Sequence, residues 1–347
     1  MSTSPASFVL ASAALLAACG GGYHARGPDG ARGVAAAGLP FAILDGRTGR
    51  EVATADFWDR LRAARAVCAG EQHPSPHDHW MQLQIVDHLT APSGRGLGVG
   101  LEMVQQPFQG VLDDWGSKRV DDAAFLARTA WAQRWGFDFD LYRPILALAR
   151  DRGAALVALN APSELVKQVA RQGVDGLTAA DRARLPALEL GDAQHRAWFD
   201  QVMAAMSDDH GAAHAHGPPP DDKAAPAAPA DADHAGAPVM PSMDNVYAAQ
   251  VVWDESMADG AARWLAAGGQ RLVILAGNGH CHDSAIVRRL GRRGVTGVTS
   301  VRPIIDDGEG NVAAAIAEGI NDYLFVMTPP AAAPAAAPAT PATPASK

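Results

Sequence analysis

The chain has 347 residues, which is enough for one large α/β domain or two small ones. Hydrophobic residues make up 48% of the sequence, an ordinary share for a globular protein. The formal net charge of -9 argues against a nucleic-acid partner held through phosphate neutralisation. The function therefore has to be sought in motifs and their positions.

The beginning of the chain has the pattern of an export signal. Residues 8–18 (FVLASAALLAA) form an apolar run that is too short to cross a bilayer, which takes about 20 residues. The run has the length of the apolar part of a signal peptide, and Cys19 and three glycines follow it. This stretch resembles a bacterial lipobox, so we expect a signal peptide over residues 1–18 and lipidation at Cys19. A signal peptide without lipidation is the alternative.

Three further segments lack the large apolar side chains that a core requires. Residues 19–38 are expected to form a tether, and the Pro/Ala/Thr-rich residues 329–347 a disordered tail. Residues 207–242 carry four histidines and are expected to be a disordered His/Pro/Ala insertion. Loose binding of a transition metal by these histidines is the alternative to a plain solvated loop. One folded domain is therefore expected over residues 39–328, interrupted by this insertion.

Within this domain, short apolar runs alternate with segments of helical spacing. The predicted strands are Ala66–Ala69, Leu97–Leu101, Ala155–Leu159, Leu272–Leu275, Val298–Val301 and Tyr323–Met327. The predicted helices include Asp56–Arg65, Ser75–Leu89, Asp140–Arg150, Ala193–Met206 and Val246–Ala267. Such alternation predicts an α/β fold, with a mostly parallel sheet flanked by helices.

Two cysteines, Cys68 and Cys281, remain in addition to Cys19. In an exported protein such a pair is a candidate disulfide, and both residues lie beside glycine-rich motifs. Two buried thiols are the alternative.

Polar side chains follow four of the predicted strands, at the point where each strand ends. Because the carboxyl ends of parallel strands meet at one edge of a sheet, and ligands bind in the crevice outside it, we expect these side chains to form one site. The residues are Glu71, His73, Glu102, Asn160, Asn278 and His280. This convergence of four segments is stronger evidence for a site than any single motif.

A helix is predicted to begin just after His73, with its N-terminus directed at this edge. Ser75 is placed to cap it, and Asp78 three residues later resembles a capping box. A helix N-terminus favours an anion such as a carboxylate, so we expect an anion-binding position there. Asp283 or Ser284 is expected to cap the helix after the second glycine motif.

Three more histidines, His77, His79 and His88, fall in the helix after His73 and are interpreted as surface residues. The apolar face predicted for this helix consists of Trp80, Leu83, Val86 and Leu89. His73 and His77 have the spacing of two metal ligands, but the HExxH motif of zinc helices is absent.

The two glutamates each have a structural alternative. Glu71 could form an ion pair with an arginine such as Arg143. Glu102 ends an apolar strand, where an unpaired carboxylate is costly to bury, and this cost favours a functional role.

Six motifs occur in order along the chain: AGEQHPSPHDHW, VGLEM, YRPILALAR, ALNAP, YAAQVVWDESMA and LAGNGH. They resemble the ChaN-like haem-binding lipoproteins of the Tiki superfamily, over roughly residues 41–327 without the insertion. The resemblance implies a lipid-anchored protein of the bacterial cell envelope that binds haem and is linked to haem or iron uptake. It implies a Tiki/ChaN/erythromycin-esterase-like fold and a possible homodimer. The resemblance alone does not separate a carrier from an enzyme, and we expect a carrier more than an enzyme. Cys281 and the insertion depart from the family pattern.

Under this interpretation the strand ends and one helix supply the haem-binding residues. The candidate axial ligands are His73, His280 and Tyr142, with Tyr247 a weaker one. Arg143 and the helix N-terminus are candidates for holding the propionates. The cofactor-binding set is then Glu71, His73, Glu102, Tyr142, Arg143, Asn160, Asn278 and His280.

A hydrolase is the alternative function, because the same superfamily is similar to metal-dependent proteases and to erythromycin esterases. A divalent metal held by His73, His280 and a carboxylate would activate water. Without metal, His73 would act as general base, with Glu71 or Glu102 orienting it. The catalytic residues would then be Glu71, His73, Glu102 and His280.

Overall fold

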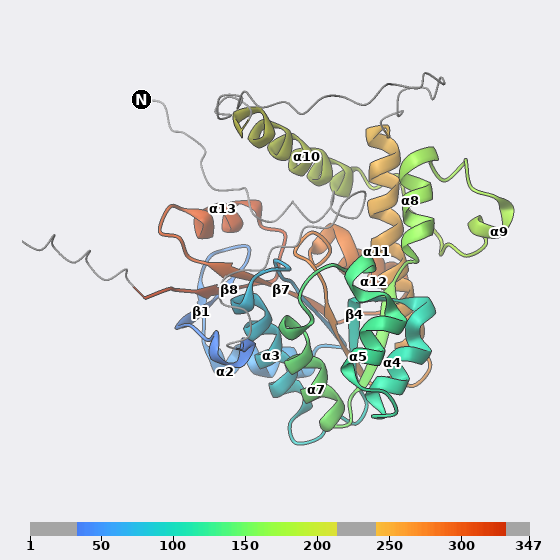
Figure 1. Cartoon of the computed structure of the whole chain (residues 1–347). Coiled ribbons are helices and arrows are strands. Elements are labelled where there is room, and N and C mark those ends of the chain that lie inside the picture. Colours follow the sequence, from blue (N-terminus) through green and yellow to red (C-terminus); the bar gives the residue numbers. More distant parts are fainter. Residues whose placement is uncertain (1–32, 214–240, 331–347) are drawn as a thin grey trace, which may run out of the picture.

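The computed structural model describes residues 33–213 and 241–330, and eight strands in these residues form one sheet (Figure 1). The order of the strands across the sheet is β2-β1-β8-β7-β3-β6-β4-β5. Their bounds are β1 Phe41–Asp45, β2 Glu51–Val52, β3 Ala66–Ala69, β4 Leu97–Gln105, β5 Ala155–Asn160, β6 Arg271–Leu275, β7 Val298–Ile305 and β8 Tyr323–Met327. The strands from β8 to β5 run parallel, whereas β1 is antiparallel to both β2 and β8. The predicted α/β fold with a mostly parallel sheet is confirmed.

All six predicted strands are present, and β1 and β2 were not predicted. The six parallel strands read as nearly continuous apolar runs because both faces of a parallel sheet are buried. In β1 only Ile43 is fully buried, so its sequence gives a weaker signal. β1 joins the sheet through an antiparallel ladder with β8, a long-range pairing that its own sequence does not specify.

Helices cover both faces of the sheet (Figure 1). On one face lie α2 Thr54–Ala63, α3 Pro76–Thr90, α4 Gln109–Gly116, α5 Asp122–Thr129 and α7 Arg143–Asp151. On the other lie α11 Met243–Ala266, α12 Arg288–Arg292 and α13 Asn311–Glu318. The other helices are η1 Val34–Ala36, η2 Gln106–Phe108, α6 Trp131–Arg134, η3 Phe139–Leu141, α8 Ser163–Gln172, α9 Ala179–Arg182, α10 Ala193–Ala213 and the π-helical turn η5 Asp283–Val287. Successive side chains of β3 alternate between the two cores, with Val67 and Ala69 in one and Ala66 and Cys68 in the other.

The central parallel strands are aligned so that their carboxyl ends lie level. Ala69 of β3 is paired with Val301 of β7 and with Leu275 of β6. Leu101 of β4 is paired with Leu275 and with Ala158 of β5. Because these residues stand on one rung, the polar residues that follow them emerge side by side.

The folded part of the chain extends beyond its expected limits in two places. Val34 is buried where η1 packs against α3, so folding begins before residue 39. α10 continues to Ala213, so the first residues of the expected insertion have helical backbone. Residues 214–240 of the insertion, the expected signal and lipidation site, and the tail after Pro330 lie outside the described residues. None of the helices in the described part has the length and apolar character that a bilayer span requires.

A disulfide joins Cys68 in β3 to Cys281 in the loop after β6, across 213 residues of sequence. Both cysteines are buried. Since Cys281 directly follows His280, the bond fixes a strand-end loop to the neighbouring strand.

Replacing both cysteines (Cys68→Ala with Cys281→Ala) is expected to lower the free energy of unfolding by about 2–5 kcal/mol, because the cross-link no longer restricts the unfolded chain. Urea unfolding at neutral pH measures the change. A thiol reductant should destabilise the wild type and leave the double variant unchanged. Equal unfolding midpoints for wild type and variant would contradict the prediction.

Candidate functional site

Glu71 and His73 form a buried acid–imidazole pair in the loop after β3. Oε1 of Glu71 lies 2.7 Å from Nδ1 of His73, and it also accepts a 3.2 Å hydrogen bond from the hydroxyl of Tyr142. The His73 ring lies against the rings of Trp135 and Phe137, with centroids 4.7 and 4.8 Å away. None of the described residues hydrogen-bonds Nε2 of His73. The pair therefore leaves one imidazole nitrogen unused beside an aromatic wall.

His79 is the positive partner of Glu71, so its interpretation as a surface residue was wrong. Its Nδ1 lies 3.1 Å from Oε2 of Glu71 and its Nε2 lies 2.9 Å from the carbonyl oxygen of His73. Because both ring nitrogens face oxygen acceptors, both carry protons. Burial alone would lower the pKa of His79, but the charge of Glu71 outweighs it and raises the pKa to about 9. In the same way the charge of His79 overcomes burial and holds the pKa of Glu71 far below its usual range.

Glu102 and His280 form a second acid–imidazole pair, between the ends of β4 and β6. The pairing of β4 with β5 shifts register between Leu101 and Gln105, and such irregularities redirect side chains. Oε1 of Glu102 lies 3.3 Å from Nε2 of His280, and its Oε2 accepts a 2.6 Å hydrogen bond from the N–H of Gly277. Burial favours the neutral acid, but the charge of His280 lowers the pKa of Glu102.

The two pairs face each other across Gly277. A Cβ atom at this position would lie 3.1 Å from Cε1 and 3.4 Å from Nε2 of His73, and 3.7 Å from Oε2 of Glu102. A side chain at this position would therefore crowd the His73 ring, and glycine lets the backbone lie close to both pairs. The structure thus brings His73 and His280 to one edge, as the strand ends predicted.

The two asparagines lie at the same edge. Nδ2 of Asn160 donates to the carbonyl oxygen of Glu102 at 2.8 Å, and the N–H of Asn278 donates to the carbonyl oxygen of Glu71 at 2.9 Å. Their side-chain oxygens are buried and have no hydrogen-bond partner among the described residues. Each asparagine therefore braces a glutamate backbone and presents an unused acceptor.

The structure does not bring Arg143 to this cluster. Its guanidinium is half exposed and pairs with Asp140 at 2.9 Å, so the structural alternative of an ion pair between Arg143 and Glu71 is wrong. Tyr142 reaches the cluster but is fully buried, and burial together with the charge of Glu71 raises the pKa of its phenol well above the usual value. Tyr247 is buried beside His195, 3.3 Å from its Nδ1.

The N-terminus of α3 is capped by its own side chains. The N–H of Asp78 donates to the Ser75 hydroxyl at 3.2 Å, as the sequence predicted. The carboxylate of Asp78 in turn accepts from the N–H of Gln72 at 2.8 Å and from the Ser75 hydroxyl at 2.9 Å. The buried Asp78 carboxylate thus lies next to the position expected to bind an external anion. Of the predicted apolar face, Val86 and Leu89 are buried and Trp80 and Leu83 pack partly buried against the same core, which also includes Met81 and Ile85.

The expected caps after the second glycine motif are absent. Asp283 forms an ion pair with Arg47 at 2.7 Å, and the hydroxyl of Ser284 lies 3.3 Å from Nδ1 of His282. The turn η5 has no side-chain cap at its first residue, and Ala285 inside it has a non-helical backbone. A bent π-helical turn stands where a regular helix start was expected.

Sequence reasoning missed the site residues that helices supply. Asp254 of α11 lies 2.7 Å from Nδ1 of His280, and His195 of α10 and Arg289 of α12 lie behind it. The signal in the sequence was an acidic pair, Asp254 and Glu255, inside the otherwise apolar stretch VVWDESMA. Both carboxylates are buried and therefore require partners.

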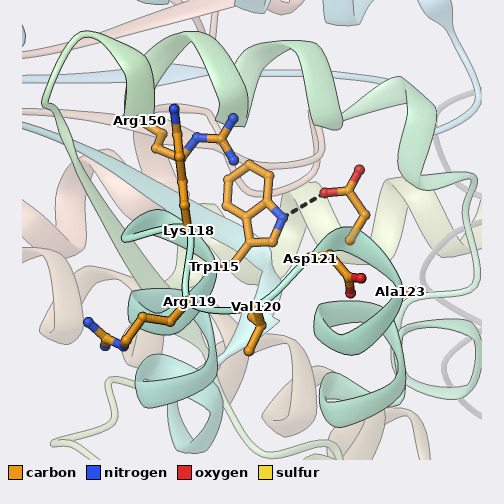
Figure 2. A pocket seen from close by; sticks show the side chains of 8 residues that line it. Trp115, Lys118, Arg119, Val120, Asp121, Ala123 and Arg150 are labelled. Carbon is orange, nitrogen blue, oxygen red and sulfur yellow. Dashed lines mark hydrogen bonds between the residues drawn. The ribbon is translucent and has the colours of Figure 1, made fainter.

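The described residues contain no group of three or more His, Cys, Asp or Glu side chains that could hold a metal ion. A cavity of about 570 Å³ lies away from the sheet edge, between α4, α5 and α7. Figure 2 shows Arg150 beside the indole of Trp115, 4.4 Å from the ring, at this cavity. Lys118 at its rim is paired with Asp151 at 3.0 Å. None of the sheet-edge residues lines this cavity.

The sequence model of a known family, described as "Haem-binding uptake, Tiki superfamily, ChaN", matches residues 57–290. The chain belongs to this family. The match spans both acid–imidazole pairs, from Glu71 to His280.

A solved structure described as "Cofacial heme binding to ChaN of Campylobacter jejuni" has the same fold. Its TM-score is 0.57 at 15% identity, covering 83% of this chain and 96% of that chain. The Arabidopsis thaliana protein RETICULATA-RELATED 5, chloroplastic, is 32% identical over 132 residues. This match covers 36% of the present chain and 17% of the plant protein.

His79→Gln is expected to lower the free energy of unfolding by about 3–5 kcal/mol near neutral pH, because Glu71 loses its buried positive partner. The pKa of His79 is raised in the folded protein, so its stabilising contribution is complete below the ordinary 6.5 and is lost as the pH rises through about 9. The difference in free energy of unfolding between wild type and His79→Gln should therefore become smaller as the pH rises from 6.5 to about 9. Urea unfolding at several pH values measures it.

His88→Gln is the matched control, because His88 lies on the same helix, stacked on Trp58 and away from Glu71. This control should keep the wild-type dependence of stability on pH. If the difference in free energy of unfolding between wild type and His79→Gln stays constant from neutral pH to beyond about 9, then His79 is not held protonated.

Proposed function

We propose that this chain binds haem at the sheet edge and serves haem or iron uptake at a bacterial cell envelope. The observation that carries the proposal is the family match, which spans the whole edge from Glu71 to His280. The similarly folded Campylobacter protein is described as binding haem cofacially, and this supports the same ligand here.

Of the candidate iron ligands, one residue has a side-chain atom that is available to a haem iron. His280 has both ring nitrogens engaged by carboxylates, and Tyr142 is buried as a neutral phenol that donates to Glu71. His73 keeps Nε2 without a partner, beside Trp135 and Phe137. His73 is therefore our proposed axial ligand. Haem supplies an iron centre that takes such a nitrogen, and aromatic rings suit the flat macrocycle.

Glu71 orients the His73 ring so that Nε2 is the nitrogen that could bind iron. The ionised carboxylate can only accept, so Nδ1 of His73 donates to it, and Nε2 is left as the ring nitrogen that iron could take. Carboxylates that orient a ligating histidine in this way fix its tautomer and raise its basicity. Glu71 is thus the orienting partner, and Tyr142 and His79 hold Glu71 in place.

The proposal includes lipid anchoring at Cys19 and a homodimer as the haem-binding form. The apolar run before Cys19 supports the anchor. The disulfide between Cys68 and Cys281 is of the kind that persists in oxidising compartments outside the cytosol. The plant relative adds no function, because the match covers a small part of it.

Hydrolysis of an ester or amide is the second candidate, and the Glu71–His73 pair favours it. An imidazole with one nitrogen on a carboxylate and the other unused is arranged to take a proton from water. His280 would then hold Glu102 in its ionised form opposite this base.

Titration of the full chain with haemin tests the first proposal. Wild type should give a saturable Soret shift, and His73→Ala should abolish it because the iron loses its ligand. Glu71→Gln should weaken binding by about 10- to 100-fold, as expected for loss of an orienting partner. Tyr142→Phe and His280→Gln should keep the shift.

His77→Ala is the control for His73→Ala. His77 is partly buried in the same segment and its ring bonds the carbonyl oxygen of Ala37, outside the cluster. It should bind haemin as wild type does. An unchanged Soret shift in His73→Ala would overturn the proposed axial ligand.

Turnover of model esters and peptides by the same proteins tests the second candidate. If the site hydrolyses them, His73→Ala should reduce the rate by about 10²- to 10⁴-fold, the usual contribution of a positioned general base. No turnover in the wild type, together with haemin binding, decides for the carrier.

A further inference from the structure

A buried network of charges lies directly behind His280, and neither proposed function uses it. Its centre is Asp254, which α11 places with its side chain fully buried. Oδ1 of Asp254 lies 2.7 Å from Nδ1 of His280. Oδ2 lies 3.2 Å from Nε2 of His195 and 3.7 Å from Nη1 of Arg289. Asp254 thus connects the strand-end loop to α10 and α12.

His280 lies between two carboxylates that contact opposite nitrogens of its ring. Asp254 contacts Nδ1, and Glu102 contacts Nε2 at 3.3 Å. The side-chain amide of Gln250 also lies 3.2 Å from Nδ1, but a carboxylate at 2.7 Å can only accept, so Nδ1 carries a proton. The same reasoning places a proton on Nε2 against Glu102.

We infer that Asp254 is a positioning residue of the sheet-edge site: it holds His280 in one orientation with both ring nitrogens protonated, so that His280 serves as a fixed donor to Glu102. His280 then has no lone pair for iron or for abstracting a proton. Glu102 is held between this donor and the N–H of Gly277, opposite His73.

The groups around His280 are consistent with this charge state. Burial alone would lower the pKa of His280, but the charges of Glu102 and Asp254 raise it to about 10. The charge of Arg289 in turn keeps Asp254 ionised despite its burial, and its pKa is far below the usual range. His195 also faces Asp254, and His282 in the same loop is neutral because burial lowers its pKa to about 3.

The test is an NMR titration of the imidazole nitrogens in the full chain labelled with ¹⁵N-histidine, without any added ligand. The His280 signal is assigned by its loss in His280→Gln. Wild-type His280 should remain doubly protonated at about pH 8, where an ordinary histidine is neutral. Asp254→Asn should lower the pKa of His280 by about one to three units, because one of two facing charges is removed. Asp254→Glu, which keeps the charge, should retain the doubly protonated form.

Glu255→Gln is the matched control. Glu255 is the next residue of α11 and is equally buried. It pairs with Arg292, with Arg293 at 2.6 Å and with Arg289 at 3.4 Å, so its replacement also removes one partner of Arg289 while leaving Asp254 in place. Its replacement should cost stability as Asp254→Asn does, yet leave the His280 titration at its wild-type position. If the pKa of His280 falls equally in Asp254→Asn and Glu255→Gln, Asp254 has only a general structural role and the inference is overturned.

The wild-type titration can still overturn the inference if Asp254→Asn fails to fold. A neutral His280 at about pH 8 in the wild type would overturn the inference. The outcome is separable from the proposed function, because the titration needs no haem. If haemin fails to bind the wild type, the proposed function fails and the NMR result still decides the role of Asp254.

Discussion

Carboxylates buried at the ends of parallel strands must each face a positive group, and the rest of the site follows from this constraint. An isolated buried carboxylate is costly, so it is either neutralised or paired. Here Glu71 faces His79, Glu102 faces His280, and Asp254 faces His280 and Arg289. These pairings favour the protonated form of His79 and His280, whereas His73 keeps its Nε2 without a partner among the described residues.

The strand-end part of the site could be predicted from the sequence because it depends on backbone pattern. Apolar runs such as Ala66–Ala69 and Leu272–Leu275 identify buried parallel strands, and parallel strands end at a common edge. The residues after those runs then share one place, whatever the order of the strands. The strand order itself, and the antiparallel addition of β1 and β2, rest on long-range pairings that no local pattern records.

The helix-borne part of the site could not be predicted, because burial of a polar side chain on a helix depends on its partner. His79 lies on the buried face of α3 with Gln82 and Val86, but hydropathy assigned it to the surface. It is buried because Glu71, from another element, compensates its charge. Asp254 was missed for the same reason: its partners come from α10, α12 and the loop after β6.

The disulfide and the helix network hold His280 from two sides. Cys281, the next residue, is bonded to β3, and Asp254 fixes the ring from α11. On the other side of Gly277, His73 is held by Glu71 alone through Nδ1, and its Nε2 has no described partner. The His280 ring is thus held by carboxylates at both nitrogens, while the His73 ring is held by one at a single nitrogen. A carrier and a hydrolase would both use Nε2 of His73. In a carrier this nitrogen would bind the haem iron, and in a hydrolase it would accept a proton from water.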